Sequence, residues 1–250
     1  MENEGDSLSL MIGTPAYAGC SSPYMAALTA TLVGLHNDGI QATPFILPGV
    51  SIISHARNEI GRIFQQLSGA DYLLGIDADI SWTYPTVQRM LARARKTGAE
   101  FIVALPPLRQ FLVGKIAAAA VEKLPNPTRR GRNFAVRHLG EEPDVPGRLD
   151  LDEEGFGKIQ AAGLAFALIH KSVFAKLSKA HPELRYRALD KTAGYCLYNP
   201  MVRNEHSFGE DMSFCQRWRD LGGDIWLLAD APLGHEGPMY IDGNYAENLS

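Results

Sequence analysis

The length, composition and charge of the chain exclude several classes of protein. With 250 residues, 46% of them hydrophobic and 21% charged, the sequence is typical of a globular protein with a substantial core. Its formal net charge of −4 provides no global basic field for nucleic acid or anionic lipid. No apolar run approaches the roughly 20 residues that span a bilayer, and the acidic N-terminus lacks the basic segment of a signal peptide. Three cysteines without CxxC spacing predict free thiols, so we expect a cytoplasmic enzyme or binding protein.

Strand and helix signals alternate over the first 105 residues. Strands are expected at residues 9–14, 43–49, 72–76 and 101–106. Helices that end at a glycine are expected between them, at residues 21–39, 55–69 and 84–98. This alternation is typical of a parallel sheet with helices on its faces, in which ligands bind beyond the carboxyl ends of the strands.

The middle of the chain breaks this pattern. Residues 123–158 are rich in proline, glycine and charge, which predicts a long loop, a lid or an irregular excursion. Regular structure returns with a strand and helix over 158–180, a helix over 208–223 and a last strand at 224–229. Within the excursion, four arginines form either a solvated loop or a contact with phosphate: Arg129, Arg130, Arg132 and Arg137.

Two aspartates follow the third expected strand, in the stretch YLLGIDADISW. Residues two apart along a strand point the same way, so Asp77 and Asp79 are able to face one site. Two like charges this close repel unless a cation lies between them, and hard oxygen ligands favour Mg²⁺, Mn²⁺ or Ca²⁺. The alternative is a solvated turn whose acids cap the next helix, and the D-x-D pattern alone does not decide between the two.

The stretch SHARNEIGRIFQQLSGADYLLGIDADI resembles the donor-binding half of GT-A glycosyltransferases, and it is most similar to their family-2-like and mannan-polymerase-like members. The resemblance implies an α/β GT-A fold, a Rossmann-like mixed sheet flanked by helices, in a single domain over residues 1–250. It divides the domain into a nucleotide-sugar half (9–105), a loop or lid (106–158), an acceptor half (159–237) and a C-terminal tail (238–250).

The resemblance also assigns a set of residues to the nucleotide-sugar donor: Thr14, Pro15, Tyr17, Arg57, Asp77, Ala78 and Gly163. Thr14 would hydrogen-bond the base and Tyr17 would stack on it, whereas the alternative for this loop is a plain turn. Arg57 would contact the nucleotide or its diphosphate, because its fork of donors suits phosphate oxygens. A surface arginine is the alternative. Gly163 would let the backbone approach the sugar, or it lies in an ordinary buried strand.

Two motifs in the second half complete the resemblance. The stretch GEDMSFCQRWRDLGG is similar to the Glu-Asp motif of these transferases, with Glu210 and Asp211 at a helix start where negative charge is favourable. One of them would position or deprotonate the acceptor hydroxyl, and ordinary capping is the alternative. In LGHEG, His235 takes the place of a late metal ligand, although a lone histidine is more often structural. The implied ligands of Mn²⁺ or Mg²⁺ are Asp77, Asp79 and His235.

The activity that the resemblance implies is metal-dependent transfer of a sugar from a nucleotide diphosphate sugar to an acceptor hydroxyl. A UDP-sugar is favoured and a GDP-sugar is the alternative. The acceptor stays open between a saccharide, a protein, a small molecule and a hydroxymethylated DNA base. Two other classes stay open as well. One is a sugar-nucleotide pyrophosphorylase, which the loop GTPAYAGCSS disfavours because it has no lysine or arginine. The other is a module that binds a nucleotide, or nucleic acid through the arginine stretch.

Overall fold

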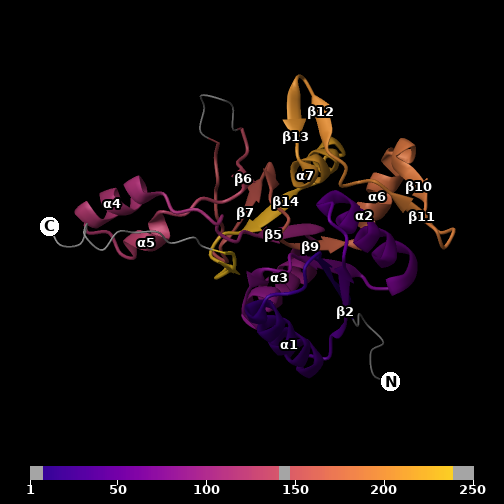
Figure 1. Cartoon of the computed structure of the whole chain (residues 1–250), viewed down its shortest axis with the longest axis horizontal. Coiled ribbons are helices and arrows are strands. Elements are labelled where there is room, and N and C mark those ends of the chain that lie inside the picture. Colours follow the sequence, from indigo (N-terminus) through magenta and orange to yellow (C-terminus); the bar gives the residue numbers. More distant parts are fainter. Residues whose placement is uncertain (1–7, 141–146, 239–250) are drawn as a thin grey trace.

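The computed structural model describes residues 8–140 and 147–238 and has a seven-stranded mixed sheet between two layers of helices (Figure 1). The strand order is β2-β1-β3-β9-β5-β14-β7. In that order the strands are Gln41–Pro48, Ser9–Ala16, Tyr72–Ile76, Phe166–His170, Phe101–Ala104, Ile225–Leu228 and Phe156–Ile159. The expected mixed sheet flanked by helices is thus confirmed.

The directions of the strands determine where their carboxyl ends lie. β1 is parallel to β2 and β3, and β14 is parallel to β5. β9 runs antiparallel between β3 and β5, and β7 runs antiparallel to β14. The alternation of strands and helices did not predict these two antiparallel strands. Because β9 opposes both of its neighbours, β1, β3, β5 and β14 all point the same way, and their carboxyl ends meet at one edge of the sheet.

Helices cover both faces of the sheet because successive strand residues point to opposite sides. On one face, α1 (Ser22–Asn37) and α3 (Tyr84–Thr97) enclose a core that includes Ile12, Leu74 and Met90. On the other, α2 (Ile53–Ile63), α6 (Lys171–Ala180) and α7 (Glu210–Asp220) enclose a second core around Phe174 and Phe214. Figure 1 shows the first pair below the sheet and the other three helices above it.

Local signals set the ends of these helices. The Ser21 side chain accepts a hydrogen bond of 3.2 Å from the backbone N–H of Tyr24 at the start of α1, as an N-cap residue does. α3 ends at Gly98, whose φ of 71° is the left-handed conformation that glycine adopts most readily. α2 begins earlier than expected and continues into a π-helix, η1 (Phe64–Ser68).

The middle of the chain is more regular than its composition indicated. It contains α4 (Val113–Val121), α5 (Pro127–Arg130) and β6 (Val136–Arg137), which pairs with β8 (Ala161–Ala162). The alanine-rich run of α4 is a helix signal that the expectation of a loop or lid over residues 106–158 overlooked. Figure 1 shows α4 and α5 projecting from one side of the sheet as a separate lobe.

Short elements complete the fold. After α6 come a 3₁₀ turn, η2 (Pro182–Leu184), and two hairpins, β10 (Arg185–Arg187) with β11 (Ala193–Tyr195) and β12 (Met201–Arg203) with β13 (His206–Phe208). β4 (Ile80–Ser81) pairs with β15 (Gly234–His235) at the strand ends. The three cysteines are free thiols. In the described ranges no helix has both the length and the apolar character that crossing a membrane requires. The expected tail after residue 238 lies outside those ranges.

Candidate active site

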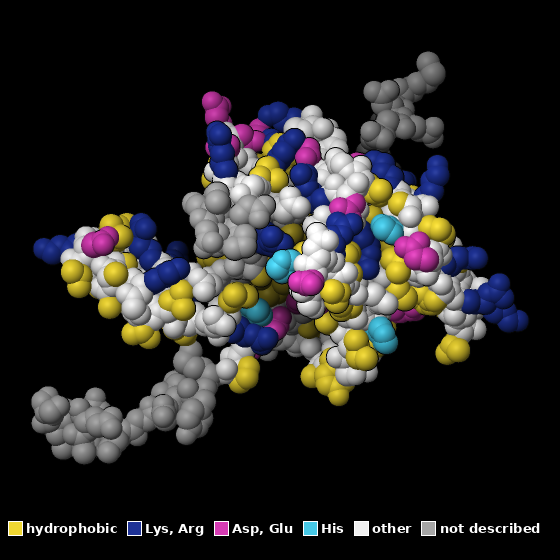
Figure 2. All heavy atoms as spheres, turned by 90° about the horizontal axis from the view of Figure 1, so that it is seen from above, with side chains coloured by type: hydrophobic (Ala, Val, Ile, Leu, Met, Phe, Trp, Pro, Cys, Tyr) yellow, Lys and Arg dark blue, Asp and Glu magenta, His cyan; other side chains and the backbone are white. Residues whose placement is uncertain are grey.

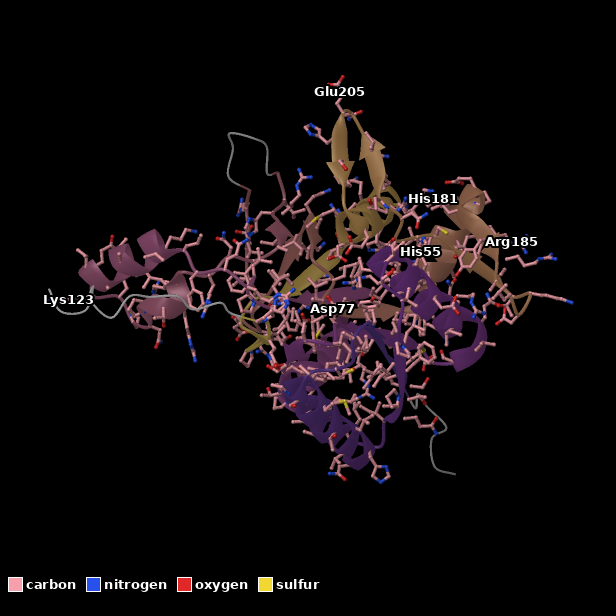
Figure 3. All side chains as sticks on the ribbon, in the orientation of Figure 1. His55, Asp77, Lys123, His181, Arg185 and Glu205 are labelled. Carbon is pink, nitrogen blue, oxygen red and sulfur yellow. The ribbon has the colours of Figure 1, made fainter. Side chains whose placement is uncertain are left out.

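A cavity of about 640 Å³ opens where β1 and β3 end. Its walls come from the loop after β1, the turn after β3, and two segments from farther along the chain. Figure 3 shows Asp77 near the centre of the molecule. The lining residues are Pro15, Tyr17, Ala18, Gly19, Cys20, Ser21, Ile53, Asp77, Ala78, Asp79, Arg109, Glu236, Gly237 and Pro238.

Arg57 holds two of the candidate carboxylates together. Its Nη2 donates to both carboxylate oxygens of Asp77, at 3.1 Å each, and lies 3.5 Å from Oδ1 of Asp211. Its Nη1 donates to the backbone carbonyl of Leu164 at 2.8 Å. The side chain is only 8% exposed and is not part of the cavity wall. The two terminal nitrogens of its guanidinium are thus turned to protein oxygens, and the expected contact with the donor stays a prediction.

Asp77 occupies an acidic and largely buried position at the end of β3. Burial raises the pKa of its carboxyl to about 6, against the opposing effect of the Arg57 cation, and the negative charges of Asp211, Asp79 and Glu210 raise it further. The side chain remains about a quarter exposed and faces the cavity. The pKa of Asp77 is consequently sensitive to any cation that enters the site.

Asp79 has different partners from Asp77. The two aspartates do not continue a strand, because a turn closed by the Ile80 N–H and the Asp77 carbonyl, 3.1 Å apart, separates β3 from β4. The expectation that strand geometry would align both carboxylates is therefore wrong, although both line the same cavity. Oδ2 of Asp79 lies 3.2 Å from Nη1 of Arg109 and 3.3 Å from Nε2 of His235.

His235 is oriented by a backbone carbonyl. Its Nδ1 lies 2.9 Å from the carbonyl oxygen of Pro107, which can only accept, so Nδ1 carries a proton. Nε2 therefore faces Asp79 either with a second proton, as an imidazolium, or with a lone pair. A lone pair facing a carboxylate calls for a cation between them, and histidine ligands of metals commonly donate their other N–H to a carbonyl in this way.

The protein supplies only part of a metal site. Among residues 8–140 and 147–238, no three histidine, cysteine, aspartate or glutamate side chains are close enough together to hold an ion. Asp79 and His235 form a pair, whereas both oxygens of Asp77 accept hydrogen bonds from Arg57. The expected three-residue ligand set is thus not assembled in this structure, and the metal role of each residue stays a prediction.

The Glu-Asp motif lies at the start of α7, as expected. Glu210 and Asp211 are its first two residues, and both are partly buried. Oδ1 of Asp211 is buried and makes no hydrogen bond with a described residue. A Cβ added to Gly163 would lie 3.7 Å from the other oxygen of Asp211, so this glycine borders the motif and not the cavity.

The loop after β1 contributes only part of what was expected. Pro15 and Tyr17 line the cavity, as does Ala78, and Tyr17 is 65% exposed. Thr14, by contrast, is fully buried and its hydroxyl is hydrogen-bonded to that of Tyr24. A hydrogen bond from Thr14 to a bound base is therefore excluded in this conformation. Thr14 shares the face of β1 that carries Ile12, which packs in the core.

Arg109 and Glu236 are charged cavity residues that sequence reasoning missed. Arg109 lies in the segment after β5 and pairs with Asp79, and Gly237 approaches it so closely that an added Cβ would lie 2.3 Å from its Cδ. One signal was available, because side chains that follow a parallel strand gather at the same sheet edge as those that follow its neighbours. The composition of the segment carried no such signal.

Comparison with known proteins identifies the fold and no closer relationship. No protein-family model matches the sequence, and no curated protein matches it. Among solved structures, A197 from STIV aligns at 16% identity with a TM-score of 0.51, covering 92% of this chain and 86% of that chain. GalNAc-T7, solved with UDP, GalNAc and Mn²⁺, aligns at 11% identity with a TM-score of 0.53. The alignment covers 95% of this chain but only 46% of GalNAc-T7. With its mixed sheet, this likeness shows that the chain has a GT-A-like glycosyltransferase fold.

Proposed function

We propose that the protein is a glycosyltransferase that moves a sugar from a nucleotide diphosphate sugar to an acceptor hydroxyl, with a divalent metal. The observation that carries this proposal is the cavity at the ends of β1 and β3, which Asp77, Asp79 and Tyr17 all line. Such a position is where open α/β sheets bind nucleotides. The GalNAc-T7 neighbour, which was solved with UDP and Mn²⁺, supports a UDP-sugar as the donor.

The residues beside Asp79 fit a divalent ion by their chemistry. Asp79 offers a carboxylate oxygen and His235 offers an imidazole nitrogen that its bond to Pro107 aims at Asp79. Both ligand types suit Mn²⁺, and a carboxylate suits Mg²⁺. When bound, the metal would neutralise negative charge on the departing diphosphate. Arg109, also beside Asp79, would add a second positive charge there.

The transfer itself needs a bond exchange at the sugar and a proton acceptor. The acceptor oxygen forms a bond to the anomeric carbon, the bond from that carbon to the diphosphate breaks, and the hydroxyl proton leaves. Asp211 is the candidate to take or align that proton, because it lies in the first turn of α7 next to the Arg57–Asp77 pair, and Asp77 lines the cavity. Arg57 orients Asp211 relative to Asp77. Glu210, its neighbour in the first turn of α7, is the other candidate.

The test is the melting temperature of the protein with UDP, GDP and their sugars, each with and without Mn²⁺. A ligand that binds only the folded state raises the melting temperature, with a stabilisation of about 2.7 kcal/mol at a hundred times its Kd. We expect a rise that requires both a nucleotide and Mn²⁺. The rise should disappear in Asp79→Asn and His235→Gln.

A matched control separates this result from general effects of losing a histidine. His206 is an exposed residue of β13 and lines no part of the cavity, so His206→Gln should keep the full rise. An equal rise in wild type, Asp79→Asn and His235→Gln would contradict the proposed role of Asp79 and His235 as metal ligands. No rise with any nucleotide would contradict the donor site as a whole.

A further inference from the structure

A second cavity, of about 700 Å³, lies at the ends of β5 and β14. Its volume is within the range of small-molecule sites. The segment after β5, the α5 region and the segment between β14 and residue 238 form its walls. The lining residues are Leu105, Pro107, Leu108, Arg109, Phe111, Arg129, Arg132, Phe134, Ala231, Pro232, Leu233, Gly234, His235, Gly237 and Pro238.

This wall combines arginines with exposed aromatic rings. Of the described residues, this wall holds three arginines and a histidine but no carboxylate, in a chain whose net charge is −4. Neither Arg129 nor Arg132 has a carboxylate partner among the described residues. The Arg132 guanidinium lies over the Phe111 ring, 3.8 Å from its centroid, which leaves the N–H edge of the guanidinium available for a ligand. Phe134 is 46% exposed and has no such partner among the described residues.

The second cavity adjoins the cavity at the ends of β1 and β3, which we call the donor cavity. Arg109, Gly237 and Pro238 line both, and His235, which faces Asp79, lines the second. A molecule bound in the second cavity would therefore reach the reacting end of a donor bound in the first. Figure 2 shows lysine and arginine side chains spread over the projecting α4–α5 lobe next to this edge.

We propose that the second cavity binds the acceptor through a phosphate and a planar base, which are two of the three parts of a nucleotide unit in a single-stranded nucleic acid. Guanidinium groups suit phosphate oxygens, and an exposed phenylalanine is a stacking platform for any base. This inference rests on the proposed transferase function, because a hydroxymethylated base of the bound strand would supply the acceptor hydroxyl of that reaction. The overall negative charge does not oppose it, since the basic residues that would bind the strand are confined to one wall.

The test is the binding of a fluorescein-labelled 12-nucleotide single-stranded DNA, followed by fluorescence anisotropy at several salt concentrations. The double variant Arg129→Ala/Arg132→Ala should raise the Kd at least about tenfold and lower the salt slope by about 0.7 for each phosphate that an arginine no longer neutralises. Phe134→Ala should raise the Kd about fivefold or more with the slope unchanged, because it removes stacking and no charge.

The matched control is Arg185→Ala/Arg187→Ala, which removes the same charge from an exposed hairpin. Figure 3 shows Arg185 at the opposite end of the molecule from Lys123, which follows α4. The control should change the Kd less than about twofold. Equal losses in both double variants, or no binding of the DNA at 50 mM salt, would overturn the proposal. If inorganic phosphate and dTMP displace the DNA at equal concentrations, the proposed stacking of a base on Phe134 would be overturned.

A separate measurement distinguishes this proposal from the transferase function. The Mn²⁺-dependent rise in melting temperature with UDP should be the same in Arg129→Ala/Arg132→Ala as in wild type, because neither arginine lines the donor cavity. If wild type shows no such rise, the donor site fails, while the anisotropy result still decides whether the second cavity binds DNA.

Discussion

Removing the positive charge of Arg57 should destabilise the protein strongly. In Arg57→Met, the carboxylates of Asp77 and Asp211 and the carbonyl of Leu164 lose the donor that joins them. The carboxylates are only 26% and 22% exposed, so they are left largely buried without a counter-charge. Breaking a buried ion pair by removing one partner costs about 3–5 kcal/mol. We expect a loss of this size in the free energy of unfolding, measured with urea at pH 7.

The pH dependence of this loss identifies its cause. Without the guanidinium, the pKa of the Asp77 carboxyl in the folded state rises farther above its value in the unfolded chain. The folded protein then binds more protons than the unfolded one, so its stability falls as the pH rises. The loss should therefore be smaller at pH 5 than at pH 7. A loss below about 1 kcal/mol, or one that is the same at both pH values, would refute the buried ion-pair argument.

Two further variants make this experiment decisive. Arg203 forms an exposed pair with Asp220, so Arg203→Met should cost at most about 1 kcal/mol. If Arg57→Met does not fold, Asp77→Asn in the same chain should restore part of the lost stability, because it removes one of the two unpaired charges.

Three other expectations concern single positions. The pKa of Asp77 is raised from 3.8 to about 6, so wild type should lose stability relative to Asp77→Asn as the pH rises from 4 to 6. Urea unfolding of both proteins would measure this difference. A gain in the relative stability of wild type over the same pH range would contradict the expectation. Gly13→Ala should cost about 1–3 kcal/mol, since its Cβ would lie 2.5 Å from Ile60 Cγ2, whereas Gly114→Ala, with open space, should be neutral or stabilising in thermal unfolding. Arg109→Ala should weaken Mn²⁺-dependent UDP binding about tenfold or more by calorimetry if the guanidinium contacts the diphosphate.

Local sequence signals predicted the parts of the fold that depend on neighbouring residues. The strand Tyr72–Ile76 and the helix ending before Gly98 were both correct, because an apolar run and a C-terminal glycine act within a few residues. The antiparallel insertion of β9 between β3 and β5 was missed. Which strand pairs with which depends on the competition among all the strands, and the sequence of β9 does not record its direction.

The candidate site shows the same division. The position of Asp77 at a strand end was predictable from its own segment, and so was the start of α7 at Glu210. The partners of these acids were not, because Arg109 and His235 reach Asp79 from segments distant in the chain. Thr14 is a different kind of error. Both faces of β1 are buried, with Met11 in one core and Ile12 in the other, so the alternation of β1 did not show that Thr14 is kept from a ligand.

The balance of charge at the sheet edge decides how a nucleotide diphosphate can bind. Five carboxylates face two guanidinium groups there: Asp77, Asp79, Glu210, Asp211 and Glu236 against Arg57 and Arg109. A diphosphate adds further negative charge, so without another cation its binding brings like charges together.

It follows that wild type should bind UDP weakly in EDTA. Asp79→Asn, which removes one carboxylate and frees Arg109, should then bind UDP more tightly than wild type does. In Mn²⁺ the order should reverse, because the variant lacks a metal ligand. Calorimetric titrations under the two conditions would measure both affinities. The same order in EDTA and in Mn²⁺ would show that Asp79 acts on the nucleotide through its charge alone.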